Sequence, residues 1–119
     1  MITLFEYLYR DAGNYKAFGS VALEGALTEE ELEQVRARFL ANDSLFITEQ
    51  IEVPALYPQL YQWSGGPTGD DHCWHEFAGI RVVHGGEVPA DIRIVGSAQD
   101  FVKTLMAVGT WKEERSRHF

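Results

Sequence analysis

The N-terminal part of the sequence contains two extended segments separated by turn residues, and this feature most constrains the possible fold. In Ile2–Arg10 three aromatic side chains fall on alternate positions, a pattern typical of a β-strand. Asp11–Asn14 contains Gly and Asn, which tolerate positive φ, and Tyr15–Leu27 continues as a second strand in which Gly19 and Gly25 mark bulges. So short a connection excludes a parallel crossover. The sequence therefore predicts a β-hairpin.

The residues after the hairpin predict an amphipathic helix. Thr28 and Glu31 have the spacing of a capping box, in which each side chain accepts a hydrogen bond from the main-chain amide of the other residue. Leu32, Val35 and Phe39 recur at helical spacing and form one apolar stripe. We expect this helix to end near residue 42 and to bury its stripe against a sheet.

A second long helix is predicted toward the C-terminus. Ser97 is its N-cap, the helix covers Ala98–Val108, and Phe101 and Leu105 lie on its apolar stripe. We expect Trp111 to pack where this helix ends.

Three further segments between the helices have strand character, namely Leu45–Ile51, Phe77–Val83 and Ile92–Val95. Pro54 suits the first turn of a short helix, and the Gly-rich run Ser64–Asp71 has the composition of a loop. Strands and helices in this order predict an α+β domain.

The predicted organisation is a single α+β domain over residues 1–111, followed by a polar C-terminal tail over 112–119. The expected sheet is mainly antiparallel, has four or five strands and starts with the β-hairpin. Two longer helices and one short helix complete the fold, mainly on one face of the sheet.

Composition excludes several classes of protein. The formal net charge of −8 over 119 residues argues against direct binding to nucleic acid, which requires a basic surface. Cys73 is the only cysteine, so neither an intramolecular disulfide nor a multi-cysteine zinc site is possible. The sequence shows no signal-peptide pattern and no run of about 18 apolar residues that would span a membrane. We therefore expect a cytoplasmic protein that works without a cofactor.

The densest polar chemistry lies in Asp70–Glu76, which contains His72 and His75. In a helical turn their spacing would place both rings on one side, whereas in a strand they would point to opposite faces. Since the next residues predict a strand, we expect a loop-to-strand junction with hydrogen-bonded polar side chains. The alternative is a metal-binding protein or metal-dependent enzyme that uses Asp71, His72, His75 and Glu76.

Acidic residues are concentrated in the first half of the chain, where residues 1–60 hold 10 Asp and Glu against 4 Lys and Arg. Several of them begin the first helix, where the helix dipole favours negative charge. The same carboxylates suit a basic partner protein, because complementary charge speeds association. The residues expected to bind a partner are Glu29, Glu30 and Glu33 on this helix, with Tyr57, Tyr61, Trp63, Asp70 and Asp71 around the Gly-rich loop.

The aromatic residues at the rim of the loop leave a third possibility open. Tyr61, Trp63 and Trp74 could line a ligand pocket beneath the loop. A pocket requires a concavity between these rings, whereas a partner-binding surface does not.

One stretch of the sequence resembles other proteins. Trp63–Phe77 reads WSGGPTGDDHCWHEF. It resembles a stretch, W-x-G-G-P-T-x-x-D-H-x-W-H-E-F, in a set of small bacterial proteins of uncharacterised function, and Phe46–Pro54 resembles their sequences as well. The resemblance implies a bacterial, cytoplasmic protein, but it implies no activity and supplies no catalytic residue.

We interpret the sequence as a non-enzymatic, acidic protein-binding domain with no catalytic residues. Inhibitors, immunity proteins and antitoxins act in this way, by surface complementarity, in bacterial competition or in conflict between phage and host. The expected partner is a basic or nucleic-acid-binding protein, while direct contact with nucleic acid or with a membrane is not expected.

Overall fold

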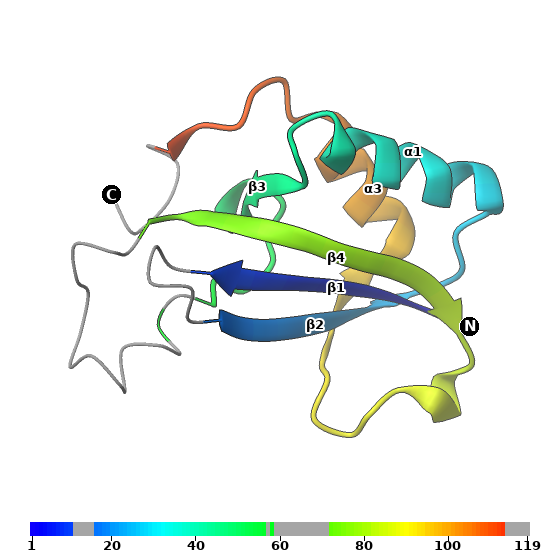
Figure 1. Cartoon of the computed structure of the whole chain (residues 1–119). Helices are drawn as coiled ribbons and strands as arrows, with labels where there is room; N and C mark the ends of the chain where they lie inside the picture. The colour runs from blue at the N-terminus through cyan, green and yellow to red at the C-terminus, as the bar shows by residue number, and fades with distance from the viewer. Residues whose placement is uncertain (11–15, 57, 59–71, 114–119) are drawn as a thin grey trace.

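The N-terminal hairpin strands are present in the structure, a computed structural model that describes residues 1–10, 16–56, 58 and 72–113 (Figure 1). β1 (Ile2–Arg10) and β2 (Lys16–Glu24) pair antiparallel along their whole length. The predicted pairing of these segments is therefore confirmed, while the turn between them lies outside the described residues.

The two glycines of the second strand have roles other than the predicted bulges. The pairing of β1 with β2 has no register shift at Gly19, so the bulge predicted there is wrong. A Cβ at this position would lie 2.7 Å from Cδ2 of Leu56, so glycine lets the Leu56 side chain pack closely against the strand. Gly25 follows the strand with a φ of 103°, which glycine adopts most readily.

In the described part of the chain the sheet has five strands, in the order β3–β4–β1–β2–β5. The outer strands are β3 (Leu45–Ile47) and β5 (Ile94–Ser97), and β4 (Trp74–Val83) lies between β3 and β1. Three neighbouring pairs are antiparallel, whereas β2 and β5 are parallel. The α+β class is confirmed, but the sheet is mixed because the chain crosses from β4 to the far edge before it forms β5.

Several predicted boundaries are wrong. The strand predicted over Leu45–Ile51 stops early and becomes a 3-10 turn, η1 (Thr48–Gln50), where local hydrogen bonds to the Thr48 carbonyl replace strand pairing. β4 begins before the predicted Phe77, and β5 lies later than the predicted Ile92–Val95. No helix begins at Pro54, because residues 53–56 are not helical, and most of the predicted short helix lies outside the described residues.

α1 (Glu29–Leu40) and α3 (Ala98–Met106) cover the same face of the sheet (Figure 1). The predicted capping box is confirmed, because the Glu31 amide donates to Thr28 Oγ1 over 3.1 Å and the Thr28 amide donates to Glu31 Oε1 over 2.9 Å. Ser97 caps α3, since its hydroxyl accepts an amide hydrogen bond from the first turn over 3.1 Å.

The turn after α1 uses different residues from those predicted. The helix ends at Leu40, and the left-handed residues that reverse the chain are Asp43 and Ser44, with φ of 54° and 66°. Asn42, which we expected to end the helix, instead donates a side-chain hydrogen bond to the Leu45 carbonyl over 2.9 Å. Its amide stabilises the entry into β3.

β1 is the centre of the main core. The Phe5 ring is fully buried under the helices, with its centroid 5.0 to 5.9 Å from five other aromatic rings. Those rings belong to Tyr7, Phe39, Phe46, Phe77 and Phe101. Trp111 extends this group, because it stacks on Phe39 with the centroids 6.3 Å apart and the Arg38 guanidinium lies over its ring.

A smaller core lies on the opposite face of the sheet. Leu4, Ala22 and Val83 are buried there, and Val88 and Ile92 pack against them from the connection that follows β4. That connection contains the short turn η3 (Gly85–Glu87) and lies on the side away from the helices (Figure 1). Both faces of β1 are therefore covered near its start. Among the described residues, no helix is long and apolar enough to cross a membrane.

The main core predicts different costs for two phenylalanine deletions. Phe39→Ala should lower the free energy of unfolding by about 3–5 kcal/mol, because Phe39 is fully buried and stacks on Phe77 with the centroids 4.7 Å apart. Phe18→Ala is the matched control and should change it little, since Phe18 is 69% exposed. Urea unfolding of both variants tests this, and equal losses would contradict the assigned core.

Candidate functional site

His75 is fully buried at the start of β4 (0% exposed). Its Nε2 atom accepts a hydrogen bond from the Leu56 amide over 2.9 Å, and its Nδ1 atom lies 3.1 Å from the Cys73 carbonyl oxygen. Since an amide can only donate, Nε2 carries no hydrogen, and Nδ1 must hold the proton that it donates to Cys73. The ring is therefore a neutral imidazole with a defined tautomer.

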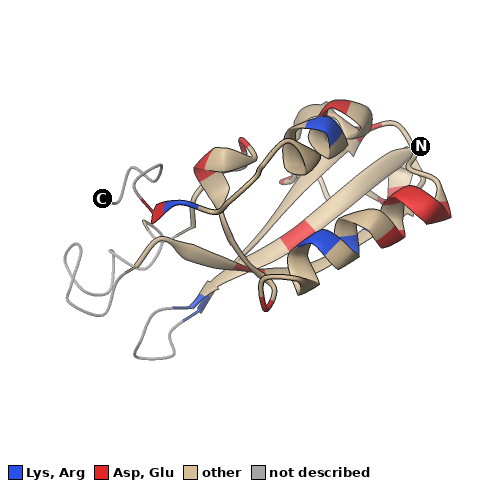
Figure 2. Cartoon of the chain, turned by 90° about the horizontal axis from the view of Figure 1, so that it is seen from above, with Lys and Arg blue, Asp and Glu red and all other residues tan. Residues whose placement is uncertain are grey.

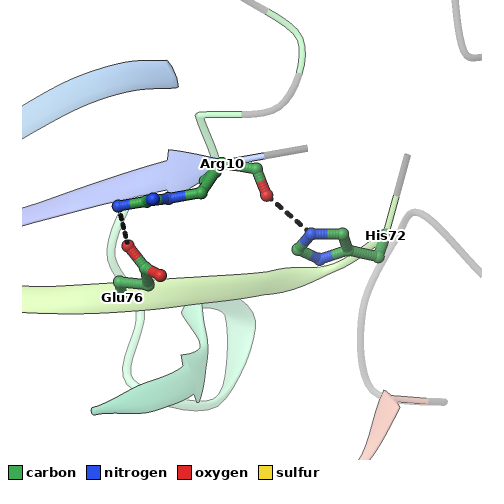
Figure 3. Close-up of polar contacts among 3 residues, drawn as sticks. All are labelled: Arg10, His72 and Glu76. Carbon is green, nitrogen blue, oxygen red and sulfur yellow. Dashed lines mark hydrogen bonds and ion pairs between the residues drawn. The ribbon is translucent and has the colours of Figure 1, made fainter. Parts of the chain in front are cut away.

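His72 is half-buried just before β4 and has the opposite tautomer. Its Nδ1 atom accepts a hydrogen bond from the Trp74 amide over 3.0 Å. Its Nε2 atom lies 2.7 Å from the Arg10 carbonyl, which can only accept, so Nε2 carries the proton (Figure 3). His72 thus joins the end of β1 to the beginning of β4.

Tyr9 contacts both histidines, and we call His72 and His75 the histidine pair. The Tyr9 ring centroid lies 5.0 Å from that of His72 and 5.2 Å from that of His75. Its hydroxyl oxygen also accepts a hydrogen bond from the His72 amide over 3.0 Å. Because the register of β1 positions Tyr9 opposite His75, the central strand brings the pair together.

A surface ion pair lies beside the histidine pair. Arg10 Nη2 is 3.3 Å from Glu76 Oε2, so the same arginine contacts β4 through its side chain and His72 through its carbonyl (Figure 3). Glu76 follows His75 in the strand and therefore points to the other face of the sheet. The side chains of His75 and Glu76 therefore do not converge on one point.

The bonding of the histidine pair bears on the metal-site hypothesis. A neutral imidazole has one nitrogen lone pair for a metal ion, and in each of these rings that lone pair already accepts a main-chain amide hydrogen. Glu76 points away from His75, and Asp71 lies outside the described residues. Among the described residues, no group of three His, Cys, Asp or Glu side chains is placed to hold a metal. The geometry therefore favours a structural role for the pair.

Burial lowers the pKa of His75 from 6.5 to about 4. The hydrogen bond to the Cys73 carbonyl and the charge of Glu49 raise it in opposition, and His72 lowers it slightly further. A charged His75 would also present a second N–H to the Leu56 amide, a donor facing a donor. The folded protein therefore keeps this ring neutral well below the pH at which an exposed histidine is protonated.

The predicted acidic residues of α1 are exposed. This holds for Glu29, Glu30 and Glu33 alike. We call these three residues the acidic surface. Figure 2 shows acidic residues at the N-terminal end of α1 and basic residues toward its C-terminal end.

Glu31 differs from its acidic neighbours because it has a structural role. Its hydrogen bond with the Thr28 amide is the largest of the effects that lower its pKa, and a side-chain hydrogen bond with Gln99 of α3 adds to them. The Gln99 contact joins the first turns of the two helices. At their other ends, Arg38 Nη2 donates to the Val108 carbonyl over 2.8 Å. The acidic surface therefore lies on a helix that is bonded near both of its ends to α3 and the residues that follow it.

Of the other residues predicted to bind a partner or line a pocket, the structure describes only Trp74. Tyr57, Tyr61, Trp63, Asp70 and Asp71 all lie outside the described residues. Trp74, which we expected to line a pocket with two of them, is half-buried, and its Nε1 donates to Glu113 Oε1 over 2.8 Å. That bond fastens the beginning of the predicted polar tail to the sheet.

A groove of about 500 Å³ lies at the C-terminal end of α3. Its lining includes Gln50, Thr104 and Lys112. The Gln50 side chain donates to the Thr110 carbonyl over 3.0 Å and accepts from the Lys112 amide over 2.7 Å, so it supports the chain after α3. These bonds give the groove a rigid wall without grouping reactive side chains.

Sequence reasoning missed one contributor to these sites. Tyr9 was identified only as one of the alternating aromatic residues of the first strand, although it contacts both histidines. Comparisons with protein-family models, with curated proteins and with solved structures found no match to this chain.

The lowered pKa of His75 predicts how stability depends on pH. Below pH 6.5 the unfolded chain binds a proton at this residue, but the folded chain does not until about pH 4. The stabilisation that comes from keeping His75 neutral is thus complete above pH 6.5 and is lost as the pH falls toward 4, by about 3 kcal/mol in total.

His75→Gln tests this dependence, because Gln Oε1 can accept from the Leu56 amide but does not titrate. Urea unfolding between pH 7 and 4.5 should give a shallower slope of unfolding free energy against pH in the variant. The difference in slope should correspond to the uptake of about one proton on unfolding. Identical slopes for wild type and His75→Gln would show that His75 does not carry this dependence.

Proposed function

We propose that this chain is a non-enzymatic, cytoplasmic protein-binding domain whose acidic surface docks on a basic partner protein. The observation that carries the proposal is the exposure of Glu29, Glu30 and Glu33 on one capped helix. Three carboxylates held on a packed helix form a preorganised surface, and preorganisation reduces the entropy lost on binding.

The charges of the acidic surface are not neutralised within the described part of the protein. The two ion pairs found there, Arg10 with Glu76 and Arg81 with Glu6, involve none of its members. The nearest arginines of α1 are directed elsewhere, since Arg36 donates to the Ile80 carbonyl over 3.1 Å and Arg38 to the Val108 carbonyl. The carboxylates therefore remain able to attract a basic partner.

Helix capping explains only part of this acidity. Glu31 forms the capping box, and the dipole favours any carboxylate in the first turn, by about 0.3–1 kcal/mol each. Glu33 lies beyond the first turn, where the dipole effect declines. A surface role accounts for this carboxylate, whose position helix stability alone does not require.

The partner class follows from charge. A protein with a basic, nucleic-acid-binding face is complementary to an acidic surface of this kind, and the association would be fast and sensitive to salt. Inhibitors, immunity proteins and antitoxins are the functional types that fit. The second group of predicted contact residues, around the loop, lies outside the described residues and stays a prediction.

A charge-neutralised variant tests the proposal. In Glu29→Gln/Glu30→Gln/Glu33→Gln, capture of basic proteins by the immobilised chain from bacterial lysate should fall at least tenfold at low salt. Retention by the wild type should also fall as salt is raised, since exposed charges are screened. Melting curves confirm that the variant remains folded, with the modest loss expected at a helix N-terminus.

The matched control removes three other exposed carboxylates, as Asp43→Asn/Glu87→Gln/Asp91→Asn. These residues lie outside the acidic surface, so capture by this variant should equal that of the wild type. If both triple variants lose capture equally, binding depends on net charge alone, and the assigned surface is wrong.

A further inference from the structure

The histidine pair bonds to three main-chain groups, two of which are far away in the sequence. His75 holds the Leu56 amide, and His72 holds the Trp74 amide and the Arg10 carbonyl. Leu56 is itself buried, with 3% of its surface exposed. The two rings thus fasten the chain near position 56 and near position 72 to the same end of β1 and β4.

Protonation would break the two amide bonds. A charged imidazole has hydrogens on both ring nitrogens, so neither ring could accept from its amide. For His75 the result would be an unpaired amide and a charge inside an apolar cluster formed with Tyr7, Tyr9 and Phe46. A buried unpaired donor and a buried charge are both costly, so the charged ring must reach water.

We propose that the histidine pair is an acid-sensitive latch, in which neutral rings hold Leu56 and Trp74 in place and protonation releases this end of the sheet while the helix-covered core stays folded. This inference is independent of the proposed partner binding. The lowered pKa of His75 supports it, since burial is the main cause of that shift and release would remove the burial.

The groups that face His75 affect how readily its protonation releases the Leu56 amide. Facing His75 are Tyr7 and Tyr9 from β1, Glu49 from η1, and Cys73 and His72 from the chain entering β4. Glu49 opposes release by favouring a charged His75, but it does not outweigh burial.

The other polar groups near His72 have partners that do not involve its ring, so protonation of the ring would not break their bonds. The Arg10 guanidinium is paired with Glu76. The Trp74 indole donates to Glu113. The His72 amide donates to the Tyr9 hydroxyl, and this bond needs no change in the His72 ring.

One nearby contact does not titrate in this range and limits how far the release can extend. The Tyr7 hydroxyl donates to the Pro54 carbonyl over 2.6 Å, and burial raises the pKa of Tyr7. The chain is therefore still held at Pro54 when Leu56 is released. The opening we propose begins after Pro54 and is local.

Hydrogen exchange tests the latch on the wild-type protein. The protection factor for the Leu56 amide, corrected for the pH dependence of the chemical exchange rate, should fall about tenfold per pH unit between pH 6.5 and 4, because opening lets His75 bind a proton. Protection of the Trp74 amide should fall with it. The amides of Val35 in α1 and Leu23 in β2 report the core and should lose much less. Loss of all four in parallel would mean global unfolding and would overturn the proposal.

Substitution of both rings provides the second test. His72→Asn/His75→Gln retains an acceptor near each amide but cannot be protonated in this range, so the protection of Leu56 and Trp74 should no longer follow pH. His84→Asn is the matched control, because His84 is exposed at the other end of β4 and should leave the wild-type response unchanged. An unaltered pH response in the double variant would contradict the latch.

Discussion

The fold depends on the enclosure of β1 by a strand on each edge and, near its start, by an apolar core on each face. This strand has paired neighbours on both edges, β2 and β4, and its two faces support two separate apolar cores. The main chain of β1 is hydrogen-bonded to two strands and its side chains pack in two cores. It therefore fixes the positions of the neighbouring elements. The aromatic face of Phe5, Tyr7 and Tyr9 determines where α1, α3 and the end of β4 can pack.

The histidine pair is a consequence of that enclosure. Tyr9 is the last aromatic residue of β1, and it contacts the ring of each histidine. A buried polar ring is stable only when its hydrogen-bonding groups are paired, and here main-chain atoms do the pairing. The cost is a dependence on pH, because the same bonds that stabilise the neutral rings cannot form with charged ones.

The parts of the fold that local chemistry determines were predictable from the sequence. Alternating aromatic residues predicted β1, and Thr28 with Glu31 predicted the start of α1. Features that depend on tertiary packing were not predictable. The parallel pairing of β5 with β2 requires knowledge of the chain path after β4, and the close packing against Gly19 comes from Leu56 on a distant segment.

The candidate sites divide in the same way. Exposure of Glu29, Glu30 and Glu33 follows from the helical period, whereas the bond of Glu31 with Gln99 follows from the contact between α1 and α3. The two histidines were identifiable as polar residues before a strand, but their ring protons could be assigned only from the amides and carbonyls they meet.

The protonation of the histidine rings at neutral pH tests the account most directly. Nitrogen-15 NMR of the imidazole side chains distinguishes the two neutral tautomers from each other and from the charged form. At pH 7 we predict a neutral His75 with its proton on Nδ1 and a neutral His72 with its proton on Nε2. A charged ring at either position, or the reverse assignment of the two tautomers, would contradict the account.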